Sequence, residues 1–159
     1  MRKYAVLLMV VVAGAVLVSG CSKKEEKREA PQAGTSTKKE TVVKVPEIVT
    51  GKWKAVKIAV QDKSQNKETV YSIDVGGQLA LPDSNLTLKV ESFLPHLIME
   101  GATLTSQTNE PKNPAAQIKI FEDGKEVFKG WLFTLYPTTH AFQNPKYSFA
   151  LVDFVPAGK

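Results

Sequence analysis

Two histidines, His96 and His140, are the groups in this sequence best suited to acid–base chemistry near neutral pH. A hydrolase would need one of them beside a nucleophile and an orienting carboxylate. Ser148 and Asp153 follow His140, but no family spacing joins the three residues, and the GxSxG elbow is absent from the sequence. The histidines lie 44 residues apart without an HExxH pattern, which gives no metal-ligand spacing. We therefore expect no enzyme activity, no catalytic residue, no metal and no cofactor, and we expect each imidazole to hydrogen bond in a turn.

The single cysteine, Cys21, ends an apolar leader. Two basic residues start the chain, the run 4–18 is apolar, and VSGC follows, which is the order of a signal peptide. The apolar run is shorter than the roughly 20 residues that span a bilayer comfortably. The motif resembles the lipobox of bacterial lipoproteins, which implies cleavage after Gly20 and acyl chains on Cys21. We expect residues 1–20 to be a signal peptide and Cys21 to anchor the protein in a membrane. By the same resemblance, to lipoproteins of Gram-negative bacteria, Ser22 in place of Asp implies the periplasmic face of the outer membrane.

A polar segment, residues 22–50, separates the lipidation motif from the rest of the chain. Its first twenty residues contain no aromatic residue and no Val, Ile or Leu, so they cannot bury enough apolar surface to offset the entropy of ordering. We expect residues 21–50 to be the lipidated cysteine and a disordered tether, whose 29 residues after Cys21 reach roughly 100 Å when extended. The remaining body, 51–159, holds 12 basic and 11 acidic residues, so the formal charge of +5 does not indicate a nucleic-acid binder.

From Gly51 onward the sequence alternates apolar and polar residues over short stretches. The alternation is clearest at residues 56–60, 71–75, 86–90, 116–120 and 147–151. A period of two predicts half-buried strands, and Asp123-Gly124 between two such stretches predicts a type I′ hairpin, because both turn positions need positive φ. No helical period is sustained after residue 50. We expect residues 51–159 to form one all-β domain, a small antiparallel β-sandwich or barrel.

The aromatic stretch WLFTLYPTTHAF, residues 131–142, is either core or a binding edge. Trp131 and Phe133 share one face of a predicted strand that we expect Pro137 to end, and large aromatic side chains usually belong to cores. We therefore expect Trp131 and Phe133 to be buried. His140 and Phe142 follow the proline in a predicted loop, and the sequence leaves their role open.

The apolar stretch FLPHLIMEG, residues 93–101, also allows two interpretations. It closes one end of the sandwich, or it exposes Leu97, Ile98 and Met99 as an apolar patch for a partner or an acyl chain. The loop 105–115 that follows contains two prolines and is expected to be extended. We predict that a binding edge, if there is one, forms where 93–101, 106–114 and 137–145 come together.

Residues 105–145 resemble a known family. The resemblance rests on TSQTNEPKNPAA, EDGKEVFKGWLF and YPTTHAFQNPKY, within a similarity that spans about residues 51–155. Its most diagnostic pieces are GWLF at 130–133, Pro137, His140 and Asn144-Pro145. They resemble the domain of unknown function 2155 of proteobacterial envelope proteins. The resemblance implies a compact β-rich envelope domain and supplies no activity.

Three functions follow from these observations. The first is a non-enzymatic envelope lipoprotein that binds or assists another envelope protein, with Leu97, Ile98, Met99, Trp131, His140 and Phe142 as candidate contact residues. The second is a carrier of a small ligand or lipid, with an apolar pocket lined by Phe93, Met99 and Trp131. The third, which the missing motifs disfavour, is a periplasmic hydrolase that uses His140.

Overall fold

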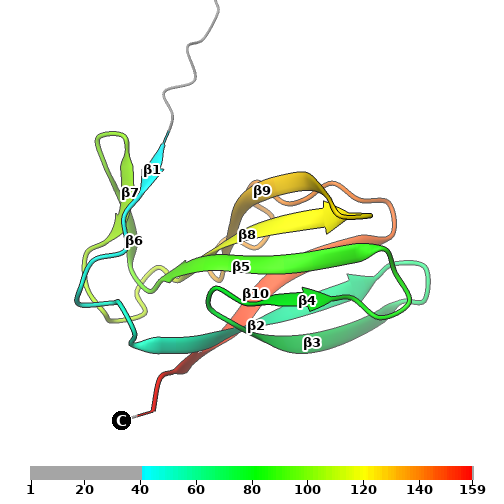
Figure 1. Ribbon diagram of the computed structural model, residues 1–159, viewed down its shortest axis with the longest axis horizontal. Helices are drawn as coiled ribbons and strands as arrows, with labels where there is room; N and C mark the ends of the chain where they lie inside the picture. Colours follow the sequence, from blue (N-terminus) through cyan, green and yellow to red (C-terminus); the bar gives the residue numbers. More distant parts are fainter. Residues whose placement is uncertain (1–40, 159) are drawn as a thin grey trace, which may run out of the picture. The chain divides into compact units, whose positions relative to one another are not determined.

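The computed structural model describes residues 41–158, and this part of the chain consists of strands and loops (Figure 1). The strands are β1 Val42–Val43, β2 Trp53–Asp62, β3 Lys67–Asp74, β4 Gln78–Ala80, β5 Leu86–Leu94, β6 Leu97–Glu100, β7 Thr103–Ser106, β8 Ala115–Glu122, β9 Lys125–Phe133 and β10 Tyr147–Pro156. Among residues 41–158 there is no helix long and apolar enough to cross a membrane. The predicted signal peptide, Cys21 and most of the predicted tether lie outside the described residues.

Two antiparallel sheets make up the body, with strand orders β10-β2-β3 and β4-β5-β8-β9. One apolar core takes side chains from both sheets, so the sheets pack face to face as a small β-sandwich. The predicted all-β antiparallel class is thereby confirmed. The largest fully buried side chains in this core are Val56, Ile58, Leu88, Val90, Ile118 and Ile120. Each of them contributes about 1.5–3 kcal/mol by leaving water, and all six come from the alternating stretches of the sequence.

The Asp123-Gly124 pair joins β8 and β9 as the sequence predicted. Both residues have positive φ, 50° and 79°, which the type I′ turn requires. Since the turn fixes the register, Ile118 lies opposite Gly130, and the two residues face the core together. The same register decides which residues of β9 face the core and which face outward.

Trp131 and Phe133 do not lie in the core, contrary to the sequence-based expectation. Trp131 is opposite Gln117, on the outer face of the four-stranded sheet, and both aromatic side chains are half-buried. The inner face of β9 carries Phe128 and Leu132, which pack on the core. Gly130 lies between these two residues on the inner face and lets the Phe128 ring pack close to the backbone. A Cβ atom at position 130 would collide with that ring. The ring of Phe128 thus fills the place that the glycine leaves. In addition, β9 ends at Phe133, before Pro137.

A third, small sheet, with order β1-β7-β6, extends from the sandwich (Figure 1). Its strand β1 pairs in parallel with β7 through hydrogen bonds from Val42 N to Ala102 O (3.0 Å) and from Lys44 N to Leu104 O (2.9 Å). Val49, in the turn that follows β1, is only 3% exposed. The described fold therefore includes Val42 and the residues after it, and does not start at residue 51. The polar composition that predicted a tether ends before the apolar residues of 42–49.

Candidate binding surface

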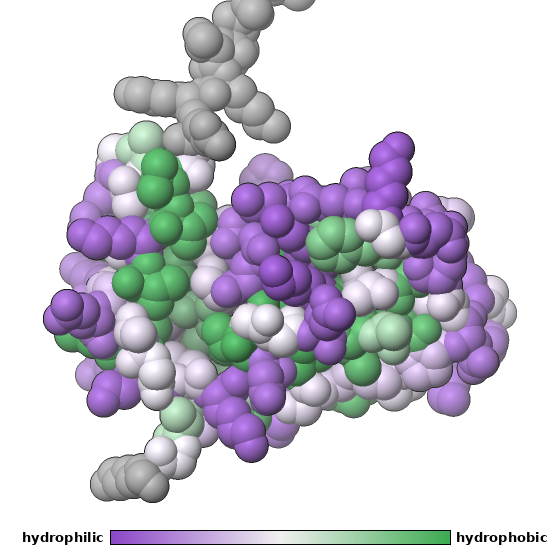
Figure 2. All heavy atoms as spheres, in the orientation of Figure 1, coloured by the Kyte–Doolittle hydropathy of each residue, from purple (hydrophilic) through white to green (hydrophobic). Residues whose placement is uncertain are grey.

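One face of the small sheet is apolar. Residues directly opposite on neighbouring strands share a face. Val43 lies opposite Leu104, and Leu104 lies opposite Met99, so the three form a row across the sheet. Leu97 is on the same face, two residues before Met99. Met99 is 63% exposed and the other three are half-buried. We call these four residues the apolar face, and Figure 2 shows hydrophobic residues gathered over this sheet.

A groove of about 250 Å³ lies along the chain that follows β1. Val45, two residues after Val43, lines the groove, together with Val49, Trp53 and Val75. The groove opens where β4 stops covering the edge of β5. Up to Val90, the backbone of β5 at that edge is hydrogen bonded to β4 and then to Gly76 and Gly77. The next three residues of β5, 91–93, line the groove. We call it the Trp53 groove.

Trp53 is held in one orientation at the wall of this groove. Its indole N–H donates to Asn109 Oδ1 at 2.8 Å. Its ring meets Phe93 and Phe154 edge to face, with both centroid distances 5.1 Å. Edge-to-face aromatic pairs add about 0.5–1.5 kcal/mol beyond the burial of their area. The groove therefore has a rigid aromatic wall before any partner arrives, which lowers the entropy lost on binding.

The one carboxylate on the groove, Glu91, is already paired. Its Oε1 atom lies 3.3 Å from Lys119 Nζ and 3.5 Å from Lys89 Nζ. Lys119 also contacts Glu126 at 3.2 Å, and hydrogen bonds from Lys119 to Glu126 and then to Glu91 raise the pKa of its ammonium. Because these charges satisfy one another, the groove presents a largely apolar surface to a partner.

Hydrogen bonds at and near His96 hold the connection between β5 and β8 in place. The imidazole Nδ1 lies 3.2 Å from Thr108 Oγ1, and the backbone N–H of His96 donates to Ser106 Oγ at 2.9 Å. Asn113 donates from its backbone N–H to Pro95 O and from its side-chain amide to Leu97 O. The imidazole of His96 thus makes a hydrogen bond, as predicted, but the residue lies at an isolated β-bridge to Asn113 and does not cap a turn. Segments 93–101 and 106–114 do come together, as expected.

The third segment, 137–145, lies elsewhere, so the predicted three-way convergence was wrong. Pro137 and Ala141 line a separate groove of about 230 Å³ over the outer face of β10-β2-β3, with Ala59 and Ala150 on its floor. Farther along, Lys63 Nζ donates to Asn144 O at 2.9 Å. The sequence could not predict where segment 137–145 lies, because its position depends on the path that residues 134–146 take from one sheet to the other.

His140 is exposed in a turn of this segment, with a φ of 52°. Within residues 41–158 its ring has no hydrogen-bond partner, so the expected capping bond is not formed. Asp153, once a possible orienting group, instead accepts a hydrogen bond from Lys57 Nζ at 2.7 Å. That bond, together with one from the backbone N–H of Phe154, holds the pKa of Asp153 below its usual value. In the described part of the chain, no three His, Cys, Asp or Glu side chains gather closely enough to hold a metal ion.

The structure separates the six candidate contact residues. Only Leu97 and Met99 lie on the apolar face, since Ile98 is opposite Thr105 and so on the other face of the small sheet. Trp131 is on the outer face of the four-stranded sheet. Phe142 packs against the core, 5.4 Å from the Phe128 ring and 6.0 Å from the Phe149 ring by their centroids, which corrects its expected place at a binding edge.

Sequence reasoning missed Val43, Val45, Trp53 and Leu104. The alternation VVKV at 42–45 was a usable signal for the first two, but it lies in a stretch assigned to the tether. The pairing of β1 with β7 joins residues about sixty positions apart, and no local pattern predicts that.

Comparisons with known proteins add nothing to this geometry. No family model matches the chain, and no curated protein or solved structure is similar enough to count as a match. The resemblance to the domain of unknown function 2155 therefore stays a prediction.

Proposed function

We propose that this protein is a non-enzymatic, lipid-anchored envelope lipoprotein that binds another envelope protein through the apolar face and the Trp53 groove. The observation that carries the proposal is the apolar row from Met99 across Leu104 to Val43, which is followed two residues along the chain by Val45 in the lining of the Trp53 groove. Contiguous exposed apolar surface with a polar rim is typical of protein interfaces. An aromatic anchor at a groove is typical of the residues that carry binding energy.

The anchor in this proposal comes from the sequence. Acyl chains on Cys21 would hold the protein on the periplasmic face of the outer membrane, because two or more chains give stable attachment. Strand β1 begins at Val42, and the 20 residues from 22 to 41 would span at most about 70 Å if they were fully extended. The apolar face contains β1, the first strand after that segment. Its partner would therefore be a protein within this distance of the membrane.

A carrier of lipid or another small ligand has less support. Phe93, Met99 and Trp131, the residues expected to line its pocket, lie apart: Phe93 in the core, Met99 on the small sheet and Trp131 on the outside of β9. The grooves described above, of about 250 and 230 Å³, are smaller than the roughly 300–1,000 Å³ usual for pockets that enclose drug-sized ligands.

Site-specific photo-cross-linking in intact cells tests the proposal. A photoreactive residue replaces Met99 in one strain and Val152 in another, since both side chains are exposed (63% and 46%) but Val152 lies on β10, away from the apolar face. A discrete adduct at position 99 only, lost when Leu104→Glu is added and reduced when Cys21→Ser removes the anchor, is the expected result.

Two outcomes would overturn the proposal. Equal adducts at positions 99 and 152 would mean that the apolar face has no special partner. An adduct at position 99 that persists with Leu104→Glu, in a protein whose thermal unfolding is unchanged, would mean that the apolar contacts do not carry the binding.

A further inference from the structure

The edges of the two sandwich sheets differ in how well they are protected. An edge strand presents unpaired N–H and C=O groups that can pair with another chain, and proteins usually block such edges with bulges, lysines or very short strands. Strand β10 has two register shifts along its pairing with β2, and the pairing of β9 with β8 has one, with Lys125 and Lys129 on β9. Strand β4, at the other edge of the four-stranded sheet, has only three residues. These edges are therefore poorly suited to pairing.

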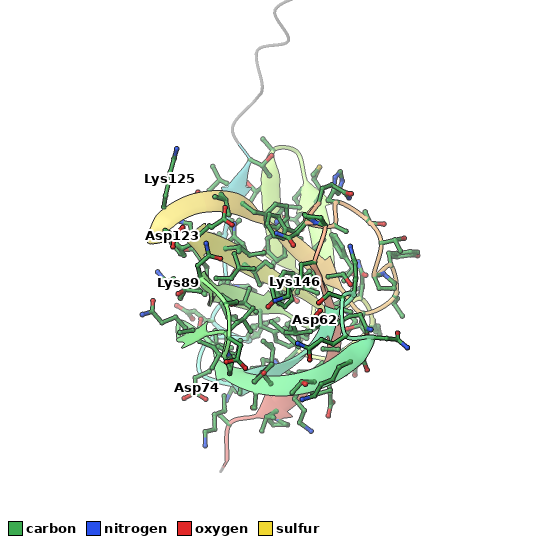
Figure 3. The ribbon with its side chains drawn as sticks, turned by 90° about the vertical axis from the view of Figure 1, so that its right-hand side faces the viewer. Asp62, Asp74, Lys89, Asp123, Lys125 and Lys146 are labelled. Carbon is green, nitrogen blue, oxygen red and sulfur yellow. The ribbon has the colours of Figure 1, made fainter. Side chains whose placement is uncertain are left out.

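Strand β3 is an edge without such protection. Its eight residues pair with β2 without a register shift, and within residues 41–158 no strand pairs with its other side. Figure 3 shows β3 crossing the lower front of the molecule, with Asp62 near one end and Asp74 at the other. The charged residues of β3 are at its ends, whereas residues 69–72 in its middle are uncharged. Nothing in the strand itself prevents another strand from pairing there.

Three residues of β3 turn their backbone groups outward. In an antiparallel pair, every second residue of a strand bonds to the neighbouring strand. Val75 N donates to Lys54 O at 2.9 Å, so the residues of β3 that bond to β2 are the odd-numbered ones. The N–H and C=O groups of Glu68, Val70 and Ser72 therefore point away from β2. All three residues are exposed, Val70 by 50%.

We propose that this edge pairs with the same edge of a second copy of the chain, in an antiparallel dimer whose two-fold axis passes between the two Val70 residues. In this register Val70 lies opposite Val70 of the second copy, and Glu68 lies opposite Ser72 of the second copy. All the outward N–H and C=O groups of Glu68, Val70 and Ser72 then find partners on both strands. A register shifted by two residues in either direction keeps the faces matched but leaves some of these groups unpaired. The contact is isologous, as in most homodimers.

The side chains also fit a second copy. Residues directly opposite each other share a face, so the two Val70 side chains would cover each other. On the same face, Glu68 lies in one row with Ser72 and then Lys57 of the second copy, because Lys57 is opposite Ser72 within each chain. The serine is small, and the Lys57 ammonium, which donates to Asp153 at 2.7 Å, has further N–H groups to offer. A carboxylate would thus approach an ammonium on each side of the axis, which favours a second copy over an unrelated strand.

Disulfide formation in intact cells that make the full chain tests the dimer. A contact along one strand is small, so the dimer should be weak and is best examined where the protein is concentrated. The Cα atoms of a hydrogen-bonded antiparallel pair are about 5.5 Å apart, which suits a disulfide. Val70→Cys should therefore give a product of about twice the mass of the chain, which disappears on reduction. Val152→Cys, on β10 and 46% exposed, is the matched control and should give no such product. A product formed through Cys21 would appear equally in both variants, since both contain it.

A second pair of variants tests the register. Glu68→Cys and Ser72→Cys, expressed together with tags of different size, should link to each other. Neither should link to itself, because identical positions would be about 14 Å apart along the strands. Adding Val70→Lys to both chains places two ammonium groups opposite each other and should lower the mixed product about five- to ten-fold. Thermal unfolding checks that these exposed substitutions leave the fold intact.

The results have opposite meanings for the dimer. A disulfide at Val70→Cys together with the mixed product of Glu68→Cys and Ser72→Cys supports it. Absence of the Val70→Cys product, an equal product from Val152→Cys, self-linking at 68 or 72 as efficient as mixed linking, or a disulfide of Val70→Cys with a different protein would each overturn it. The dimer does not depend on the partner surface, which is tested at Met99, so failure of one proposal leaves the other standing.

Discussion

Replacing Phe142 by alanine should destabilise the domain and leave the proposed partner surface intact. Phe142 sits between Phe128 and Phe149, at centroid distances of 5.4 and 6.0 Å, and packs on the core from the 134–146 loop. A fully buried Phe→Ala change costs about 3–5 kcal/mol. Because Phe142 is only half-buried but loses two aromatic neighbours, we expect a loss of about 2–3 kcal/mol.

Denaturant unfolding followed by tryptophan fluorescence measures this loss, since Trp53 and Trp131 are both in the folded part. With the roughly 4 °C per kcal/mol expected for a domain of this size, the Tm should fall by about 8–12 °C. His140→Ala, two residues away but exposed, is the matched control and should change stability by less than about 0.5 kcal/mol. If Phe142→Ala cost less than His140→Ala, or abolished cross-linking at Met99 without loss of stability, the packing role of Phe142 would be refuted.

Three further changes test other parts of the structure. Gly124→Ala puts a side chain at a φ of 79° and should cost about 1–2 kcal/mol in a thermal melt; an unchanged Tm would mean that the turn is not type I′. Lys57→Met removes the main cause of the low pKa of Asp153, so a carboxyl NMR titration should show that pKa rising toward 3.8. The stability that the lowered pKa contributes is present above pH 3.8 and is lost as the pH falls through the lowered pKa. A pKa of Asp153 that is the same in both proteins would contradict the ion pair. Asn109→Ala frees the indole N–H of Trp53 and should shift the Trp53 emission and cost about 1 kcal/mol, whereas an identical spectrum would contradict the bond.

The sandwich itself was readable from the sequence. Period-two alternation identified β2, β3, β5, β8 and β10, because each buries one face in the same core. The Asp123-Gly124 pair placed the β8–β9 hairpin, since few residues tolerate positive φ at both turn positions. In these elements local chemistry and tertiary packing demand the same residues.

The faces of β9 could not be read from the sequence. Alternation shows that Trp131 and Leu132 point to opposite sides, but it does not say which side meets the other sheet. Size favoured Trp131 for the core, whereas the core side in fact has Gly130, covered by the ring of Phe128. Gly130, a residue type that usually weakens a strand, marked the place where the Phe128 ring packs against the backbone of β9.

The candidate surface was out of reach for a related reason. Leu97 and Met99 stood out as apolar residues, but their neighbours on the apolar face come from β1 and β7. Long-range pairings of this kind depend on the whole fold and not on any local pattern.

The parallel pairing of β1 with β7 gives the fold a mechanical property. Any tension that reaches the domain from its amino-terminal side acts first on β1, which pairs with β7 over two residues, Val42 and Val43. A ladder of two residue pairs should yield to force before the longer ladders of the sandwich do. When β1 detaches, Val43 leaves the row formed with Leu104 and Met99, and Val45 is drawn from the groove. The proposed partner would then be held less tightly while the core stays folded, so that pulling on the amino-terminal side of the domain would favour its release.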